Sequence, residues 1–162
     1  MKTKKVMFLG LSVALAMVLS FIESQIPPLF VIPGIKVGLP NIVMVVLLYK
    51  IGWREAVAVN IIRIVLVSML FGNIQTMTFS IAGAVLSLIG MIPLKRWFSC
   101  ITVSILGGAL HNIGQIIMAV IWTDTAQILS YLPVLLISGF FAGVAVGIVS
   151  GIIVKKIENV NL

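Results

Sequence analysis

Long apolar segments separated by short polar connections dominate the chain. A bilayer crossing needs about 20 mostly apolar residues, and six segments approach that length. The predicted spans cover approximately residues 6–23, 39–49, 53–71, 75–94, 99–122 and 131–154. We therefore predict an all-α polytopic membrane protein, whose six helices form one compact transmembrane domain over residues 1–162.

The second predicted span is the shortest. The apolar run at 39–49 would reach only about 17 Å as an α-helix. Either the span begins earlier, around Val31, or it crosses as a broken helix. Irregular backbone at membrane depth is tolerated only where protein or a water-filled cavity surrounds it. The run PGIKVGLPN (33–41) is therefore either a cavity wall or an ordinary external loop that leads into a helix.

Composition supports the membrane interpretation. The chain is 61% hydrophobic and 9% charged, with a mean hydropathy of +1.27. A soluble domain carries about 25% charged residues, so these charges are too few to cover a water-facing surface. The basic start and apolar run of residues 1–21 imitate a secretory signal. Because further spans follow, we expect this segment to be retained as the first helix.

The distribution of basic residues predicts the orientation in the cell membrane. The net charge is +7, from eleven Lys and Arg against four Asp and Glu. In the six-span arrangement nine of the eleven lie on one side: Lys2, Lys4, Lys5, Lys50, Arg54, Lys95, Arg96, Lys155 and Lys156. The positive-inside rule then places both termini in the cytoplasm. Since these residues occupy short connections without interleaved aromatic residues, we expect the lipid bilayer, and no nucleic acid, as their partner.

Arg63 lies deep within the third predicted span. It follows Arg54 by nine residues, which places it about 13 Å into a hydrocarbon core of about 30 Å. An Arg at that depth costs at least about 2.5–3.5 kcal/mol and indicates a functional site. Asn60, three residues earlier, shares its helix face. The structural alternative is an ion pair, for which Glu23 at the outer end of the first span is the plausible partner.

A second polar group interrupts the fifth predicted span, in the segment GALHNIGQ (108–115). His111 and Gln115 share one helix face, with Asn112 on its flank. Unpaired polar groups are expensive in lipid, so this face must look into the bundle. Interhelical hydrogen bonds of about 0.6–2 kcal/mol each are one explanation. We favour a polar cavity shared with Arg63, because three such groups occur within little more than one turn.

The polar residues also indicate a kind of ligand. Arg63 and Lys36 are cationic and His111 can become so, which favours an anionic or polar organic molecule. The predicted substrate-binding residues are Arg63, His111, Asn112, Gln115, Asn41, Asn60, Lys36, Ser80 and Glu23. We expect no catalytic residue, metal or cofactor. Four acidic residues cannot build an aspartate-rich Mg²⁺ site, a single His and Cys cannot hold zinc, and no P-loop is present.

Small residues recur at helical spacing in two spans. Gly139, Gly143, Gly147 and Gly151 form one stripe on the sixth span, and such stripes let helix backbones approach closely. We interpret this stripe as internal helix packing. The first span has a smaller stripe of Ser12, Ala16 and Ser20, with Gly10 and Ala14 on a neighbouring stripe.

Four segments carry a resemblance to a known family. They are GIKVGLPN (34–41), Asn60 with Arg63, FSIAGAVLS (79–87) and GGALHNIGQ (107–115). Through them the chain resembles the Gx transporter family, often labelled heptaprenyl diphosphate synthase component I. That family is similar to the substrate-binding S components of energy-coupling factor (ECF) transporters. The resemblance covers nearly the whole chain.

The resemblance implies capture of a vitamin-like small molecule from outside. A membrane coupling protein and two cytoplasmic ATPases would drive its release inside. The coupling protein would contact the first helix at Ser12, Ala16 and Ser20, or at Gly10 and Ala14. The pocket would open outward, lined by Asn41, Arg63, His111, Asn112 and Gln115. The alternatives are a non-transporting anchor for a flavin- or quinone-linked electron-transfer module and an accessory subunit in prenyl-lipid metabolism.

Overall fold

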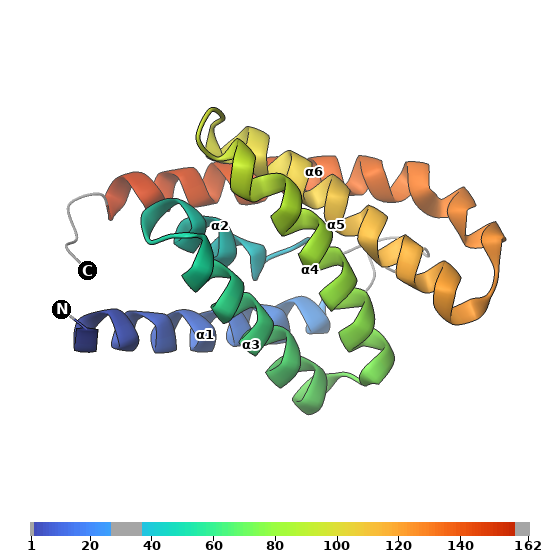
Figure 1. The fold of residues 1–162 in the computed structure, drawn as a ribbon, viewed down its shortest axis with the longest axis horizontal. Helices are drawn as coiled ribbons and strands as arrows, with labels where there is room; N and C mark the ends of the chain where they lie inside the picture. The colour runs from blue at the N-terminus through green and yellow to red at the C-terminus, as the bar shows by residue number, and fades with distance from the viewer. Residues whose placement is uncertain (1, 27–36, 158–162) are drawn as a thin grey trace.

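Six α-helices and one short 3-10 helix make up the described part of the protein (Figure 1). The computed structural model describes residues 2–26 and 37–157, and no strand occurs in these two ranges. The elements are α1 (Lys2–Gln25), α2 (Asn41–Lys50), α3 (Trp53–Phe71), α4 (Ile74–Leu94), α5 (Cys100–Thr123), η1 (Ala126–Tyr131) and α6 (Leu132–Lys156). The all-α prediction is confirmed, and one helix corresponds to each predicted span.

The helices differ in their ability to cross a bilayer. Four apolar segments are long enough: Thr3–Gln25, Ile74–Leu94, Cys100–Thr123 and Ala126–Lys156. The protein is therefore a membrane protein. In contrast, α2 has ten residues and reaches only about 15 Å. The 19 residues of α3 include Arg54, Glu55 and Arg63. Six complete crossings thus stay a prediction.

The helices surround the short helix α2. Along the bundle α5 packs between α4 and α6, α4 also packs on α3, and α3 packs on α1. The short helix α2 itself contacts α6, α3 and α1. Figure 1 shows α1 and α6 running in opposite directions on either side of α2. The start of α1 and the end of α6 therefore lie at the same end of the bundle.

The glycine stripe of α6 faces α5. A Cβ atom at Gly143 would lie 2.6 Å from Ile105 Cα, and one at Gly147 would lie 2.5 Å from Ile101 Cα. Both distances are impossible for a real side chain, so only glycine permits this helix separation. At Gly151 the nearest atom would be Cys100 Cβ at an ordinary 3.8 Å. The stripe thus packs inside the chain, as interpreted from the sequence, and its contact loosens toward the end of α6.

The small residues of α1 fall on two opposite faces. Ser12, Ala16 and Ser20 are buried within the bundle, whereas Gly10 and Ala14 lie on the exposed face. The prediction that Ser12, Ala16 and Ser20 form an external partner surface is therefore corrected. The Ser12 and Ser20 hydroxyl groups donate to carbonyl oxygens one turn earlier in the same helix, both at 2.8 Å. Only Gly10 and Ala14 stay available from the predicted partner-helix interface.

A dense apolar core closes one end of the bundle. Its centre is α2, where Val45, Leu47 and Leu48 are at most 1% exposed. Polar links lie at the same end. Lys95 Nζ donates a hydrogen bond to the Leu48 carbonyl oxygen at 2.8 Å, and Lys5 pairs with Glu55. The core around α2 therefore forms one wall of any cavity in the other half of the bundle.

Candidate functional site

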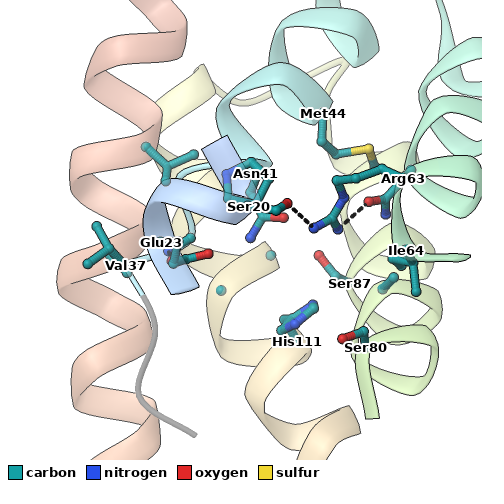
Figure 2. A pocket seen from close by; sticks show the side chains of 18 of the residues that line it. Ser20, Glu23, Val37, Asn41, Met44, Arg63, Ile64, Ser80, Ser87 and His111 are labelled. Carbon is teal, nitrogen blue, oxygen red and sulfur yellow. Dashed lines mark hydrogen bonds between the residues drawn. The ribbon is translucent and has the colours of Figure 1, made fainter. Parts of the chain in front are cut away.

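A cavity of about 350 Å³ occupies the half of the bundle beyond α2. Its walls come from the last turns of α1, residues 37–41, and the facing sides of α3, α4, α5 and α6. The volume equals that of about a dozen water molecules and falls in the range of small-molecule pockets. Figure 2 shows polar side chains from several helices around this space. The cavity is therefore large enough for a small organic molecule.

Arg63 of α3 projects into the cavity, where neutral groups hold its guanidinium (Figure 2). Nη2 donates to Asn60 Oδ1 at 2.7 Å, and the (i, i+3) spacing on one helix makes this contact possible. Nη1 donates to Ser20 Oγ of α1 at 3.4 Å. Asn60 and Ser20 are both buried. These two contacts fix the direction of the guanidinium and leave further N–H donors on its cavity side.

Glu23 lines the same cavity, but the ion pair with Arg63 that was the structural alternative does not form. Within the described ranges the one ion pair joins Lys5 to Glu55. Glu23 Oε1 instead accepts a hydrogen bond from the backbone N–H of Gly38. Gly38 has a φ of +80°, which glycine adopts without strain. The Glu23 contact thus holds the start of α2 against the end of α1, and Arg63 keeps its charge without a paired carboxylate.

The polar residues of α5 reach the cavity by different means. Asn112 Nδ2 donates to the Leu135 carbonyl oxygen of α6 at 2.5 Å, so the interhelical alternative accounts for this amide group. The His111 ring packs against α4 at Gly83, where a Cβ atom would lie 2.9 Å from its Nδ1. Figure 2 shows the ring directed toward the cavity space below Arg63. Gln115, one turn later, also lines the cavity.

The structure brings eight of the nine predicted substrate-binding residues to this one cavity. They are Glu23, Asn41, Asn60, Arg63, Ser80, His111, Asn112 and Gln115. Lys36 and residues 33–35 of the predicted wall lie outside the described residues. Four of the five described residues of that wall line the cavity: Val37, Gly38, Pro40 and Asn41. Contact with a substrate stays a prediction for all of these residues.

Several serines line the cavity without having been predicted. Ser87 of α4 donates to Met91 Sδ at 3.2 Å, which is a weak acceptor. Ser104 of α5 is 4% exposed, and its Oγ has no hydrogen-bond partner among the described residues. Ser20, assigned from sequence to a partner surface, and Ser68 also line the cavity. Ser87 follows Ser80 by two helical turns, so it shares the helix face of a predicted site residue. This spacing could have identified Ser87 from sequence.

Comparison with known proteins places the chain in a family. The family model described as heptaprenyl diphosphate synthase component I matches residues 12–153. The chain belongs to the heptaprenyl diphosphate synthase component I family. The matched range includes every cavity-lining residue, and the resemblance drawn from sequence is confirmed at the family level. No curated protein and no solved structure matches the chain.

The chemistry of the cavity is that of recognition by a cation and neutral hydrogen-bonding groups. Its described lining contains one arginine, one glutamate and one histidine among hydroxyl, amide and apolar side chains. In residues 2–26 and 37–157 no group of three His, Cys, Asp or Glu side chains is arranged to hold a metal ion. This member of the heptaprenyl diphosphate synthase component I family can therefore orient a polar molecule. The groups available for this are Arg63, the Asn60 and Ser20 side chains that hydrogen-bond to it, and the cavity-lining serine hydroxyls.

Proposed function

We propose that this protein is the substrate-binding subunit of an ECF-type transporter in the cell membrane. It captures a small anionic or polar organic molecule and catalyses no reaction. The observation that carries the proposal is the cavity around Arg63. It is lined by polar groups at membrane depth and closed on one side by the core of α2. A cavity that ends inside the bundle is suited to holding a molecule, whereas a channel would need a second opening.

The charge distribution supports an outward-facing cavity. The cavity extends along α4 as far as Met91, and at its other end it is lined by the end of α1, the end of α3 and the first turns of α4. Basic residues lie at the opposite end, at the start of α1 and the ends of α2, α4 and α6. If the positive-inside rule holds, the basic end is cytoplasmic and the cavity opens toward the outside. A capture subunit for uptake needs this orientation.

The energy source is assigned to partners. The sequence contains no P-loop, and we propose that a membrane coupling protein and two cytoplasmic ATPases supply the driving force. The exposed face of α1 at Gly10 and Ala14 is the proposed contact for the coupling protein. A Cβ atom placed at Gly10 would have no other atom of the described residues within 4 Å. A partner helix can therefore approach the α1 backbone closely at this position.

Filling the cavity tests the binding function. Ala84 of α4 lines the cavity and is 6% exposed, whereas its neighbour Val85 is 51% exposed on the outer face. We expect native mass spectrometry of the wild-type protein, released from its own membranes, to show one small molecule per chain. Ala84→Phe should abolish this added mass, and Val85→Phe should retain it. A wild-type protein without a bound molecule, or Ala84→Phe with wild-type occupancy, would contradict the proposal.

Substitution on α1 tests the partner. Ala14→Trp places a bulky ring on the exposed face, and Ile148→Trp places one on an exposed position of α6 as the control. After mild detergent extraction, we expect the coupling protein and both ATPases to co-purify with the wild type and with Ile148→Trp. Ala14→Trp should lose them while keeping its bound molecule. Co-purification of a flavoprotein or quinone enzyme in their place would favour the electron-transfer anchor.

A further inference from the structure

We infer that the molecule held in the cavity is an organic monocarboxylate without a phosphoryl group, and that its carboxylate binds Arg63 beside Ser87. This inference rests on the proposed function and names the substrate class of the same cavity. It comes from the charge count of the cavity, the Ser87 hydroxyl that faces the guanidinium, and the apolar remainder of the lining.

The unpaired charge of Arg63 is the first observation. The guanidinium uses two N–H groups on Asn60 and Ser20, out of five donors. Among the described residues no carboxylate lies within ion-pair distance of it. A buried cation without a paired anion is unfavourable at membrane depth. A carboxylate on the ligand supplies that anion and matches the planar guanidinium with two parallel hydrogen bonds.

The charges of the described cavity lining favour a ligand with one negative charge over a ligand with two. Arg63 and Glu23 are the only Lys, Arg, Asp or Glu residues within the described lining. A phosphate ester carries about −1.5 to −2 at neutral pH. Beside Arg63 and Glu23, whose charges cancel, a phosphate ester would bury that whole charge as excess. A monocarboxylate adds only one negative charge, and Glu23 is already hydrogen-bonded to the Gly38 backbone.

The Ser87 hydroxyl group on the opposite wall completes the carboxylate site. Figure 2 shows the Ser87 hydroxyl, the His111 ring and the Arg63 guanidinium directed toward the same space. Ser87 donates only to the sulfur of Met91, and this weak bond is easily exchanged for an anionic acceptor. A ligand oxygen can therefore replace the Met91 sulfur as the acceptor of the Ser87 hydroxyl.

The rest of the lining indicates the body of the molecule. Apolar side chains come from α2, α3, α4 and α6: Met44, Val45, Ile64, Val67, Met91 and Val146. Between them, glycines of the lining mark the close contacts of α5 with α4 and α6: Gly107, Gly108, Gly139 and Gly143. The apolar side chains form a surface that suits an apolar body. An acid with a mainly apolar body fits both halves of the cavity.

The test identifies the retained molecule by its functional groups. Purified protein in detergent is incubated with the low-mass filtrate of a cell extract and re-isolated, and the bound molecule is extracted. Methylation in acidic methanol should add one methyl group per molecule, and phosphatase treatment should leave its mass unchanged. Retention should fall at least about 30-fold in Arg63→Gln, the loss expected for truncating one partner of a buried charge pair. Lys156→Gln, a charge removed outside the cavity, should retain the molecule fully.

A second variant distinguishes weaker binding from a loss of folding. Arg63→Lys keeps a cation in the bundle but offers a point charge in place of the planar pair of donors, so we expect weaker retention than in the wild type. A retained molecule with no carboxyl group, with several, or with a phosphoryl group overturns this inference and leaves the proposed function standing. Full retention by both Arg63 variants overturns it equally. A wild-type protein that retains nothing overturns both.

Discussion

At the scale of the residue, the site depends on how Arg63 is held without being neutralised. Asn60 and Ser20 offer oxygen acceptors that carry no net charge, so they orient the guanidinium and preserve its positive potential. Glu23, the carboxylate in the cavity, is bonded to the Gly38 backbone instead. The arrangement keeps a cation available to a ligand at a depth where an ion pair would otherwise be favoured.

Replacing Asn60 with aspartate tests this account of Arg63. Asn60→Asp keeps the shape of the side chain and places a carboxylate at the position that now lies 2.7 Å from Nη2. The protein should stay folded because the new pair is satisfied. Affinity for the extracted molecule should fall by about 30-fold, as expected when a charge pair is lost, because the ligand no longer meets an uncompensated cation.

The matched control is Asn73→Asp. Asn73 caps α4 outside the cavity, and aspartate caps a helix as well as asparagine does. Isothermal titration with the purified variants measures both affinities. Wild-type affinity in Asn60→Asp would show that the charge of Arg63 does not hold the ligand.

The charged and ionisable residues of the site could be predicted from sequence, whereas Ser87 and Ser104 were not predicted. Arg63 and His111 stand out because charged and ionisable groups at membrane depth need a reason. Ser87 and Ser104 do not stand out, since a serine in a membrane helix commonly bonds its own backbone. Only the structure shows that Ser104 lacks a partner in the described residues and that Ser20 faces Arg63.

At the scale of the element, glycine-mediated approach of α5 to α4 and α6 shapes the wall that carries His111. The α6 glycines set one side, where Gly143 and Gly147 leave no room for a Cβ atom. Gly83 of α4 sets the other side, against His111 itself. The position of α5, and hence of its polar turn, is therefore fixed by backbone contact more than by interlocking large side chains.

Alanine substitutions at two glycines of the α6 stripe test whether stability depends on close contact with α5. Gly143 is in close contact with α5, and Gly151 is not. Gly143→Ala forces a methyl group to within 2.6 Å of Ile105 Cα and should destabilise the protein by about 1–3 kcal/mol through overpacking. At Gly151 the nearest atom would be 3.8 Å away, so Gly151→Ala should stay within about 0.5 kcal/mol of wild type. Unfolding in mixed micelles measures both. Equal effects at the two positions would contradict the packing described.

The positions of the helices along the chain could be predicted from sequence, but not which side of each helix faces the interior of the bundle. The predicted span of α3 matches Trp53–Phe71, and the ends of the other helices differ by a few residues. Apolar length and flanking charges contain this information. The spacing of Ser12, Ala16 and Ser20 shows a stripe but does not say whether it faces inward. That depends on the position of α3, which periodicity does not contain.

At the scale of the whole molecule, a filled end and a hollow end divide the bundle. The core around α2 fills the end that bears the basic residues, and the cavity occupies the other. Sequence predicted six helices, and six are described. The number of crossings does not follow from that count because α2 is short and α3 is charged.

Orientation is tested by labelling single cysteines in intact cells. Cys100 is the only cysteine of the chain, so Cys100→Ser provides the background. Gln127→Cys in η1 lies beyond the hollow end, and Lys156→Cys lies at the filled end. A membrane-impermeant maleimide should label Gln127→Cys from outside and Lys156→Cys only after permeabilisation. The reverse pattern would place the cavity on the cytoplasmic side and contradict capture from outside.

The most direct measurement is an experimental structure of the protein purified together with the molecule it retains. We expect density for one compact molecule inside the cavity, with a carboxylate facing the Arg63 guanidinium and the Ser87 hydroxyl. Arg63 should still bond to Asn60 in that complex. A molecule bound on the outer surface, or a bundle in which Arg63 and His111 face separate, closed surroundings, would contradict the account.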